Sequence, residues 1–566
     1  MKRVMMCFFL AGLLLAACGQ GGVPSVAVAG TIPAVVSAPA TGVPVAVVPQ
    51  RLPKLWIQPD LPAAMREQVV IPSSVEMAAV QTDADLVLDF SGQADKAAAV
   101  VSWVYVLAAP FPTVRDGVSE REMKALLAGK AVGELGDVKI LLSAETRMML
   151  EKSGFAVTDD AVQVTSPDEM LMSAWQTPDT WGILPFEALE PRWKVLEVDG
   201  ISPFREDFST KEYPLTGSIS LSGAAWALDE AADEITLPAG NFDRGKMTTL
   251  LMTGVTALTR STAARMDEKG ILYPGEDIRE WMVSADLTHI SNEVSFNPDC
   301  PPANFGKRVM HFCSRPDYIE LLDDVGVDII ELSGNHLVDW GVPAFDYSLG
   351  LYEERDWTVF AGGRTPEAAR QPVIVEHNGN RLAFIGCNPA GPELVWATEY
   401  RSGVADCDLD WMEGQVHELR AAGVLPVVTF QYNESYGMVP GVLQKHDFER
   451  MSAAGAVVVS GSQAHHPQTM TFLDDGFIHF GLGNLFFDQM RMPDGENVPA
   501  VFDVELPVAG TRLEFLDKHI FYDGRYIGTQ LLTAILEDYA RPRPMTKEER
   551  GIFLTRMFEA SEWELE

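Results

Sequence analysis

Apolar and polar residues alternate along the first part of the chain in a pattern typical of strands separated by helices. Val100–Ala108 is an almost continuous apolar run, which predicts a strand buried on both faces. Two capping-box sequences, beginning at Ser119 and at Ser166, each predict the start of a helix. The alternation predicts a smaller α/β domain over residues 53–240.

The same alternation continues on a larger scale over residues 246–510. Asn378-Gly379, placed between two strand patterns, predicts a tight hairpin. The predicted strands of this region are Thr248–Leu258, Val327–Ser333, Arg381–Cys387, Leu425–Gln431, Ala456–Ser460 and Phe477–Leu482. The predicted helices are Arg315–Val325, Asp408–Ala422 and Gln444–Ala454. We therefore predict a second α/β domain over 246–510, followed by a C-terminal extension over 511–566 that ends in a helix.

The N-terminus has the layout of a secretory signal. Lys2 and Arg3 precede an apolar stretch too short to span a bilayer permanently. The motif LAAC, ending at Cys18, resembles a bacterial lipobox and implies that Cys18 carries a lipid; an ordinary signal peptide over 1–18 is the alternative. Residues 19–52, rich in Val, Ala, Pro and Gly, predict an extended tether. We expect an extracytoplasmic lipoprotein, anchored in the cell membrane or the outer membrane.

The charge of the chain limits its partners. Asp and Glu together number 80, against 43 for Lys and Arg, which gives a formal net charge of −37. Such a field repels nucleic acid and anionic lipid. We therefore expect no nucleic-acid partner, and an anionic substrate would need a local basic patch or a bound metal.

Four cysteines follow the signal sequence, and their number and spacing favour disulfides. An oxidising compartment makes an even number of cysteines at short spacings typical of disulfide bonds. The most local pairing joins Cys300 to Cys313 and Cys387 to Cys407. A zinc site is the alternative, but the sequence has no CxxC pair or close His–Cys pair to support it.

Polar residues suited to metal binding or acid–base chemistry follow the predicted strands of 246–510. They are Glu293, Asn335, His336, Asp339, Gln431, Glu434, Gln463, His465 and Asn484. Ligands of α/β sheets bind at the carboxyl ends of strands, so these loops are predicted to converge there. A carboxylate, amide oxygens and imidazoles together suit a hard or borderline divalent cation.

The order and spacing of these motifs resemble the CapA family of poly-γ-glutamate capsule proteins. The most specific motifs are SGNHLVDWG, SAAGAVVVSGSQAHHPQ and FIHFGLGNLFFDQ. The resemblance implies a metallophosphoesterase-like α/β/β/α sandwich with a metal site at one edge. It also implies work on an anionic envelope polymer, with other capsule-assembly proteins as partners. Within 53–240, the segment WGILPFEALEPRWKVLEVDGISPF is weakly similar to periplasmic solute-binding proteins, and a scaffold without ligand is an equal alternative.

Several positions depart from the family pattern, and one of them is Ser291, which stands where family members have an asparagine ahead of the glutamate found here as Glu293. Val255 stands where family members have an aspartate that binds metal, and Gln431 and Gln463 stand where they have histidines. The changes remove a charge and leave neutral oxygens, which bind transition metals more weakly. A two-metal site needs several anionic or imidazole ligands. We therefore expect a single Mn²⁺, Mg²⁺ or Ca²⁺, or no metal.

The resemblance also implies roles for the residues that remain. Glu293, Asn335 and His465 would hold the ion, and Gln431 and Gln463 would add neutral oxygens. In a catalytic site, His336 would be the general acid and Glu434 a base or an orienting group, in metal-assisted hydrolysis or transfer. The alternative is a non-catalytic protein that binds the polymer or acts as a scaffold, in which His336 only fixes its loop by bonding Asp339.

Overall fold

The computed structural model describes residues 51–563, except 91–96, 131–132, 137, 305–309, 490–505 and 507. The predicted signal sequence, the lipidation site Cys18 and all but the last two residues of the predicted tether lie outside the described residues and remain predictions. From Leu52 onward the described residues belong to one compact unit. None of the helices described in it combines the length and the apolar character needed to cross a membrane.

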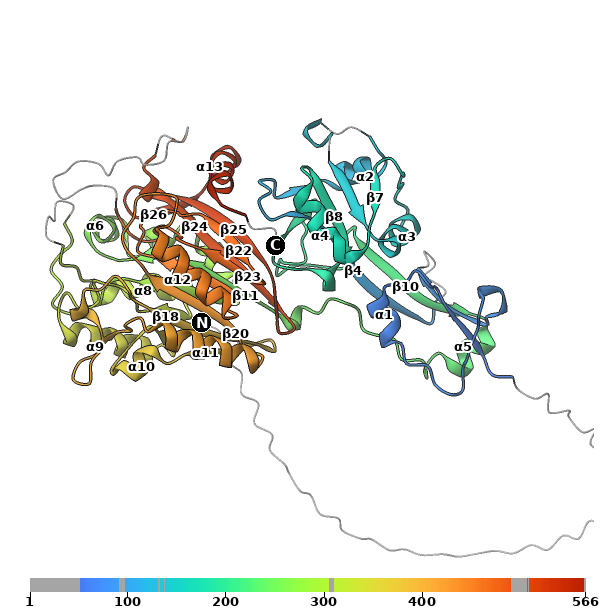
Figure 1. Cartoon of the computed structure of the whole chain (residues 1–566), viewed down its shortest axis with the longest axis horizontal. Helices are drawn as coiled ribbons and strands as arrows, with labels where there is room; N and C mark the ends of the chain where they lie inside the picture. The colour runs from blue at the N-terminus through green and yellow to red at the C-terminus, as the bar shows by residue number, and fades with distance from the viewer. Residues whose placement is uncertain are drawn as a thin grey trace, which may run out of the picture. The chain divides into compact units, whose positions relative to one another are not determined.

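A ten-stranded mixed sheet is built from the first part of the chain, with strand order β2-β1-β3-β10-β4-β8-β6-β7 and β9 paired with β4 and β5 (Figure 1). Its strands are β1 (Lys54–Ile57), β2 (Glu76–Met77), β3 (Leu86–Phe90), β4 (Ala99–Pro110), β5 (Gly117–Val118), β6 (Lys139–Leu142), β7 (Val162–Val164), β8 (Thr180–Pro185), β9 (Trp193–Val198) and β10 (Thr216–Gly223). The helices are α1 (Ala63–Gln68), α2 (Glu120–Leu127), α3 (Ala144–Lys152), α4 (Pro167–Gln176) and α5 (Ala225–Ala231). The strand predicted at Val100–Ala108 is therefore the centre of β4.

The two predicted capping boxes differ in the structure. Ser119 accepts a hydrogen bond from the backbone of Glu122, whose side chain accepts one from the backbone of Ser119, so the box at α2 is complete. At α4 the Ser166 hydroxyl instead donates to the Glu169 carboxylate, 3.0 Å away, and accepts no bond from a helix N–H. The helix at Ser166 is confirmed, but its capping box is incomplete.

Two further sheets follow. The eight-stranded sheet contains β11 (Met247–Thr253), β12 (Val255–Thr256), β13 (Leu287–Asn292), β14 (Ile329–Glu331), β15 (Thr358–Phe360), β24 (Leu513–Tyr522), β25 (Arg525–Glu537) and β26 (Arg541–Pro544). The six-stranded sheet contains β17 (Val373–His377), β18 (Asn380–Cys387), β20 (Leu425–Gln431), β21 (Val458–Ser462), β22 (Met470–Leu473) and β23 (Gly476–His479). A small pair is formed by β16 (Gly362–Gly363) and β19 (Gly403–Val404). The helices are α6 (Arg260–Lys269), α7 (Arg279–Val283), α8 (Ile319–Asp324), α9 (Val342–Glu353), α10 (Pro366–Arg370), α11 (Leu409–Ala421), α12 (Val442–Ala453) and α13 (Lys547–Ala560).

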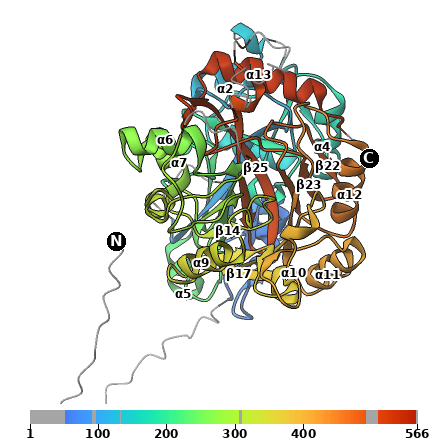
Figure 2. The ribbon, with the colours of Figure 1, turned by 90° about the vertical axis from the view of Figure 1, so that its left-hand side faces the viewer.

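These two sheets form a sandwich covered by helices on both outer faces. Successive residues of a strand point to opposite faces, and Leu250 and Val427 both belong to the core between the sheets. Their neighbours Leu251 and Val428 belong to two different outer cores, the first with residues of α6 to α9 and the second with residues of α11 and α12. Helices α11 and α12 lie side by side (Figure 2). The predicted α/β class, with its α/β/β/α sandwich, is confirmed.

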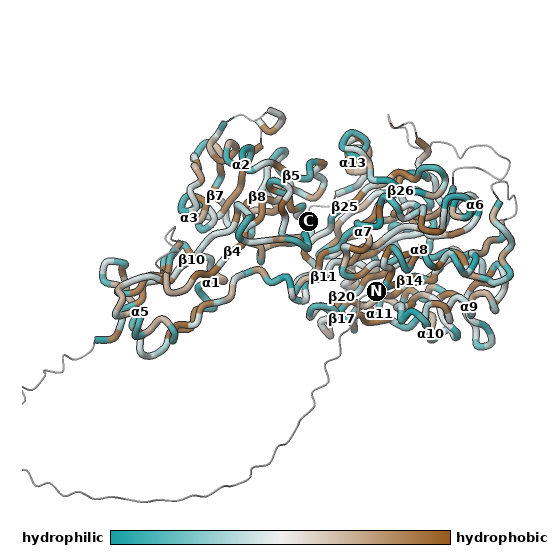
Figure 3. The backbone as a smooth tube through the Cα atoms, turned by 180° about the vertical axis from the view of Figure 1, so that it is seen from behind, coloured by the Kyte–Doolittle hydropathy of each residue, from teal (hydrophilic) through white to brown (hydrophobic). Residues whose placement is uncertain are grey.

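The chain's hydropathy follows these layers. Apolar stretches run along strands such as β14 and β20, whereas the connections around α9 and α10 are mainly hydrophilic (Figure 3). The strand predicted at Leu425–Gln431 is β20 with the same bounds. Because this strand is buried on both faces, its sequence is apolar except at Thr429 and Gln431, and its limits are clear from the sequence.

Two local predictions have different outcomes. The hairpin at Asn378-Gly379 is confirmed between β17 and β18, and both residues have the positive φ angles, 46° and 79°, that such a turn requires. The single strand predicted over Thr248–Leu258 is wrong. It divides at Gly254, where a Cβ atom would lie 2.1 Å from the carbonyl oxygen of Gly483.

The segment predicted as a C-terminal extension supplies two central strands of the eight-stranded sheet. β24 pairs antiparallel with β11 along Met247–Thr253, and β25 pairs with β24. The predicted terminal helix is α13, which begins with a complete capping box between Thr546 and Glu549. The domain boundaries themselves remain a prediction.

Both predicted disulfides are present in the structure. Cys300 is bonded to Cys313 and Cys387 to Cys407, closing loops with sequence separations of 13 and 20 residues. Loops of this size contribute about 3 kcal/mol each to stability in the chain-entropy account. The zinc alternative for these cysteines is therefore wrong.

A buried histidine predicts how stability depends on pH. His519 is 1% exposed, bonds the Thr529 hydroxyl at 2.7 Å and lies near Asp517, His479 and His289. Burial lowers the pKa of His519 to about 4, whereas an unfolded histidine titrates near 6.5. The stability that the folded protein gains by keeping His519 neutral is therefore fully present above pH 6.5. It is lost as the pH falls towards 4, because the unfolded chain then binds a proton that the folded chain does not.

We expect this one group to remove about 2 kcal/mol from the free energy of unfolding between pH 7 and pH 5. Urea unfolding at both pH values should show a smaller loss for His519→Gln than for the unchanged protein. His417→Gln, at an exposed position of α11, is the matched control and should follow the unchanged protein. An equal loss in His519→Gln and the unchanged protein would contradict the prediction.

Candidate functional site

The candidate site lies where parallel strands of both sheets of the sandwich end. β13 pairs in parallel with β14, and β20 with β21. Most of the predicted site residues follow directly from these strands: Glu293 after β13, Asn335 and His336 after β14, Gln431 and Glu434 at and after β20, and Gln463 and His465 after β21. The carboxyl ends of parallel strands are the usual place for a ligand in such folds.

Glu293 and His465 meet across the two sheets. Both are buried, at 2% and 3% exposure, and Glu293 Oε2 lies 3.9 Å from His465 Nε2. His465 Nδ1 is held by the side-chain oxygen of Asn484 at 2.8 Å. Glu293 Oε2 has no hydrogen-bond partner among the described residues. A carboxylate oxygen and an imidazole nitrogen thus face each other without a direct hydrogen bond.

His336 is oriented by Asp339. Its Nδ1 lies 2.8 Å from Asp339 Oδ2, which also accepts a hydrogen bond from the backbone of Phe312 at 2.7 Å. Burial alone would lower the pKa of His336, but the bond to Asp339 raises it. The charges of Glu293 and Glu434 act in the same direction, and together they hold the pKa of His336 above its usual value.

The amide residues of the predicted set have different surroundings. Asn335 Oδ1 is buried and has no hydrogen-bond partner among the described residues. Gln431 and Gln463, in contrast, form a close hydrogen bond with each other, and Ser462 donates to Gln431 at 2.7 Å. The two glutamine oxygens are therefore already occupied by protein donors.

Glu434 belongs to a hydrogen-bonded group at the margin of the site. Its carboxylate accepts from the Tyr436 hydroxyl and from the Gln489 amide, the latter at 3.0 Å. Burial and this carboxylate raise the pKa of Tyr436 to about 12, so its hydroxyl stays protonated. Arg260 donates to the side-chain oxygen of Gln489 at 3.4 Å and places a cation beside the group.

An apolar cluster surrounds Val255, where the family resemblance implies a metal-binding aspartate. Val255 is fully buried and packs with Ala257, Val294, Phe312 and Phe487. The Phe487 ring lies 5.1 Å from the His465 ring, between ring centroids. This part of the site therefore has aromatic and aliphatic walls where a second metal ligand would be needed.

The site meets some requirements of a metal centre and lacks others. The described residues contain no group of three or more His, Cys, Asp or Glu side chains arranged to hold a metal ion. Yet two buried oxygens have no hydrogen-bond partner among the described residues: Glu293 Oε2, which lies 3.9 Å from His465 Nε2, and Asn335 Oδ1, in the loop whose His336 bridges Val294. Buried polar atoms normally have a partner. By its chemistry this set of one carboxylate, one imidazole and one amide oxygen suits a single divalent ion and is too small for a pair.

Arg260 and Gln489 were not predicted from the sequence. Arg260 is the first residue of α6, has a φ of 51°, and lies over the rings of Phe312 and Phe487. A cation in the first turn of a helix opposes the helix dipole. This unfavourable placement of Arg260 is a feature of the sequence that could have indicated a functional role. For Gln489, the corresponding feature is its position at the end of the motif FIHFGLGNLFFDQ.

Fold and site together define an α/β sandwich protein with a polar site at the carboxyl ends of its strands. Residues 249–489, which include every residue of the site, match the family model described as "Bacterial capsule synthesis protein PGA_cap". This finding confirms the resemblance to the CapA family for that part of the chain.

Two relatives support the same assignment. The chain is 22% identical over 283 residues to the "Capsule biosynthesis protein CapA" of Bacillus anthracis, covering 48% of this chain and 66% of that protein. It is 21% identical over 202 residues to the "PGA biosynthesis protein CapA" of Bacillus subtilis (strain 168), covering 36% and 52%. The match thus spans less than two thirds of either relative.

Two solved structures are also similar to parts of this chain. The calcineurin-like phosphoesterase YfkN from Bacillus subtilis is 13% identical and covers 55% of this chain and 96% of its own, with a TM-score of 0.28. An ABC-type phosphate transport receptor from Vibrio cholerae is 11% identical and covers 27% and 71%, with a TM-score of 0.24.

Proposed function

We propose that the protein acts in the synthesis, handling or export of an anionic surface polymer similar to poly-γ-glutamate. The observation that carries the proposal is the family match over 249–489, because it encloses the whole strand-end site. Two disulfides among the described residues support an extracytoplasmic location. In the proposed arrangement a lipid on Cys18 holds the protein at the membrane, close to other capsule-assembly proteins.

His336 is the proposed acid of this site. The Asp339 carboxylate accepts a hydrogen bond from Nδ1 of His336. The other ring nitrogen, Nε2, is therefore the one that can exchange a proton with a bound group. A raised pKa keeps more of the imidazole protonated near neutral pH, which suits the donation of a proton to a leaving oxygen or nitrogen. Glu434 adds negative charge near this imidazole and supports its protonated form.

Glu293, Asn335 and His465 are the proposed ligands of one Mn²⁺, Mg²⁺ or Ca²⁺ ion. Such an ion supplies Lewis-acid polarisation of an ester or amide oxygen when it is bound. Gln463 Oε1 already accepts from the Gln431 amide, and Gln431 Oε1 already accepts from the Ser462 hydroxyl, so neither oxygen is part of the proposed set. The proposed role of the two glutamines in the present arrangement is to fix the loop after β21, through Ser462 and each other.

A non-catalytic role in polymer binding is the second candidate. It is favoured by the packing of Val255 against Phe312 and Phe487, which replaces a metal ligand by an apolar wall. In this case the same polar residues would bind the polymer without cleaving or transferring it.

The first experiment is genetic. Deletion of the gene in its native host is expected to remove most of the anionic surface polymer, and the full chain supplied in trans is expected to restore it. Polymer is measured by extraction and hydrolysis, followed by amino-acid analysis. An unchanged amount of surface polymer after deletion would contradict the proposed function.

A further inference from the structure

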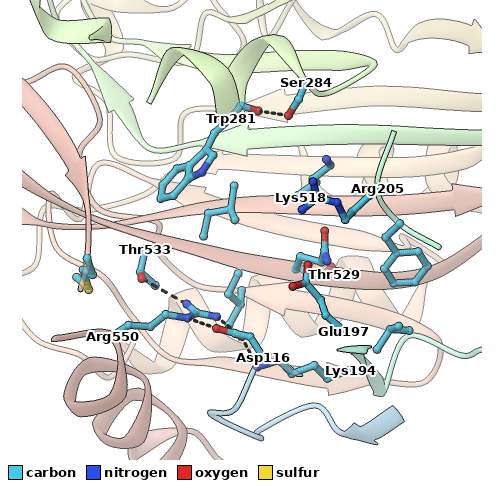
Figure 4. Close-up of a pocket in the computed structure, with 16 residues that line it drawn as sticks. Asp116, Lys194, Glu197, Arg205, Trp281, Ser284, Lys518, Thr529, Thr533 and Arg550 are labelled. Atoms are coloured by element: carbon cyan, nitrogen blue, oxygen red, sulfur yellow. Dashed lines mark hydrogen bonds and ion pairs between the residues drawn. The ribbon is translucent and has the colours of Figure 1, made fainter. Parts of the chain in front are cut away.

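A second cavity, of about 410 Å³, shares no residue with the strand-end site (Figure 4). It lies beside β9, β24, β25, α7 and α13, and its volume is within the range of small-molecule sites. Four basic and two acidic side chains line it. A basic excess is unusual on a chain with a net charge of −37 and attracts anions locally.

Lys518, on β24, is the central cation of this cavity. It is half-buried, and its ammonium group makes no hydrogen bond or ion pair with another described residue. Burial lowers the pKa of Lys518; the charges of Asp286 and Glu206 oppose this effect, and those of Arg244 and Arg205 add to it. Figure 4 shows the head groups of Lys518 and Arg205 next to each other. Two neighbouring cations are mutually repulsive, and a bound anion would relieve that repulsion.

Arg205 is only weakly engaged by the protein. Its partner is Asp207, 2.9 Å away, and the two side chains are 49% and 73% exposed. Exposed ion pairs of this kind contribute little to stability. Arg205 can therefore turn to a ligand at small cost. Burial raises the pKa of the neighbouring Glu197 carboxyl, and the charge of Arg205 offsets only part of that rise.

On the opposite wall of the cavity, the charged side chains pair with one another. Arg550 donates twice to Asp116, at 2.8 Å each, and Lys194 donates to it at 2.8 Å. Although burial would raise the pKa of Asp116, these cations hold it below the usual value. This cluster gives the cavity a fixed wall, and Lys518 is the lining cation whose side chain has no partner within the described part of the chain.

Gln530 adds hydrogen-bonding capacity next to the cations. It is the cross-strand partner of Lys518 in the β24–β25 pair, so both side chains lie on one face of the sheet. Its amide has no hydrogen bond to another described residue. An ammonium group, a guanidinium group and a free amide side by side can bind a carboxylate and a neighbouring peptide group.

We propose that this cavity binds a short γ-linked glutamate chain, with a carboxylate at Lys518 and Arg205 and an amide at Gln530. The choice of glutamate chains rests on the proposed function, whereas the anion site itself rests on the cavity. Glu197 beside the cations favours a singly charged carboxylate over a doubly charged phosphate, because like charges repel.

The test is titration calorimetry of the full chain with a γ-linked glutamate trimer. The unchanged protein is expected to bind one trimer, Lys518→Met to bind at least tenfold more weakly, and Lys518→Arg to bind within threefold of the unchanged protein. Lys139→Met removes the same charge at an exposed position outside the cavity and should leave binding unchanged. Equal unfolding temperatures of the four proteins show that the loss is local.

Three results would overturn the proposal: no binding of the trimer, equal binding by Lys518→Met and the unchanged protein, or inorganic phosphate bound as tightly as the trimer. Trimer binding with no effect of Lys518→Met would place the ligand elsewhere and leave the proposed function intact. The proposed function is decided separately by the surface polymer of the deletion strain.

Discussion

His336→Ala is expected to reduce the surface polymer of a complemented strain to the level of the deletion strain. The variant removes the proposed proton donor, and general acids of this kind contribute roughly 10²- to 10⁴-fold to rate. The His336 side chain is 16% exposed, and within the described part of the chain it hydrogen bonds only to Asp339, so its loss should lower the unfolding temperature by only a few degrees.

His417→Ala is the matched control, since it removes an exposed histidine of α11 in the same part of the chain. Asp339→Asn should give an intermediate amount of polymer, because it keeps the loop but weakens the hydrogen bond that orients the His336 ring through Nδ1. Normal polymer in the His336→Ala strain would contradict the catalytic role and leave the non-catalytic binding role.

Val255→Asp is expected to destabilise the metal-free protein by roughly 3 kcal/mol or more, because it buries a carboxylate without a partner. Val255 is fully buried among Val294, Phe312 and Phe487, none of which has a polar side chain. The measurement is urea unfolding in the presence of a chelator. Loading with Mn²⁺ should restore part of the loss, since the new carboxylate would reach an ion held near Glu293.

Val255→Thr is the control for this substitution, because it introduces a neutral hydroxyl of similar volume. Its cost should be clearly smaller than that of the aspartate, and Mn²⁺ should not change it. A stable Val255→Asp protein without metal would contradict the apolar character that we assign to this wall.

Features that depend on neighbouring residues could be predicted from the sequence. The hairpin at Asn378-Gly379, the strand Leu425–Gln431 and the helix over Asp408–Ala422, observed as Leu409–Ala421, follow from turn chemistry and periodicity. The break at Gly254 depends on the close approach of Gly483, which is distant in sequence. For the same reason no local pattern indicates that β24 completes the sheet beside β11.

The candidate site shows the same division. The motifs place Glu293, His336 and His465 at strand ends, and the structure brings Glu293 and His465 to 3.9 Å. Whether a side chain is already occupied is not visible in a motif. Gln431 and Gln463 carry suitable oxygens, but in the folded chain they hydrogen bond to each other.

The most direct test of the central claim is the metal content of the full chain after loading with Mn²⁺ or Ca²⁺ and removal of free ion. We predict one equivalent per chain, lost in Glu293→Ala and retained in Glu376→Ala, an exposed glutamate of β17. Mass spectrometry of the metal provides the count. No metal above background, or an equal content in Glu293→Ala, would contradict a metal site formed by Glu293, Asn335 and His465.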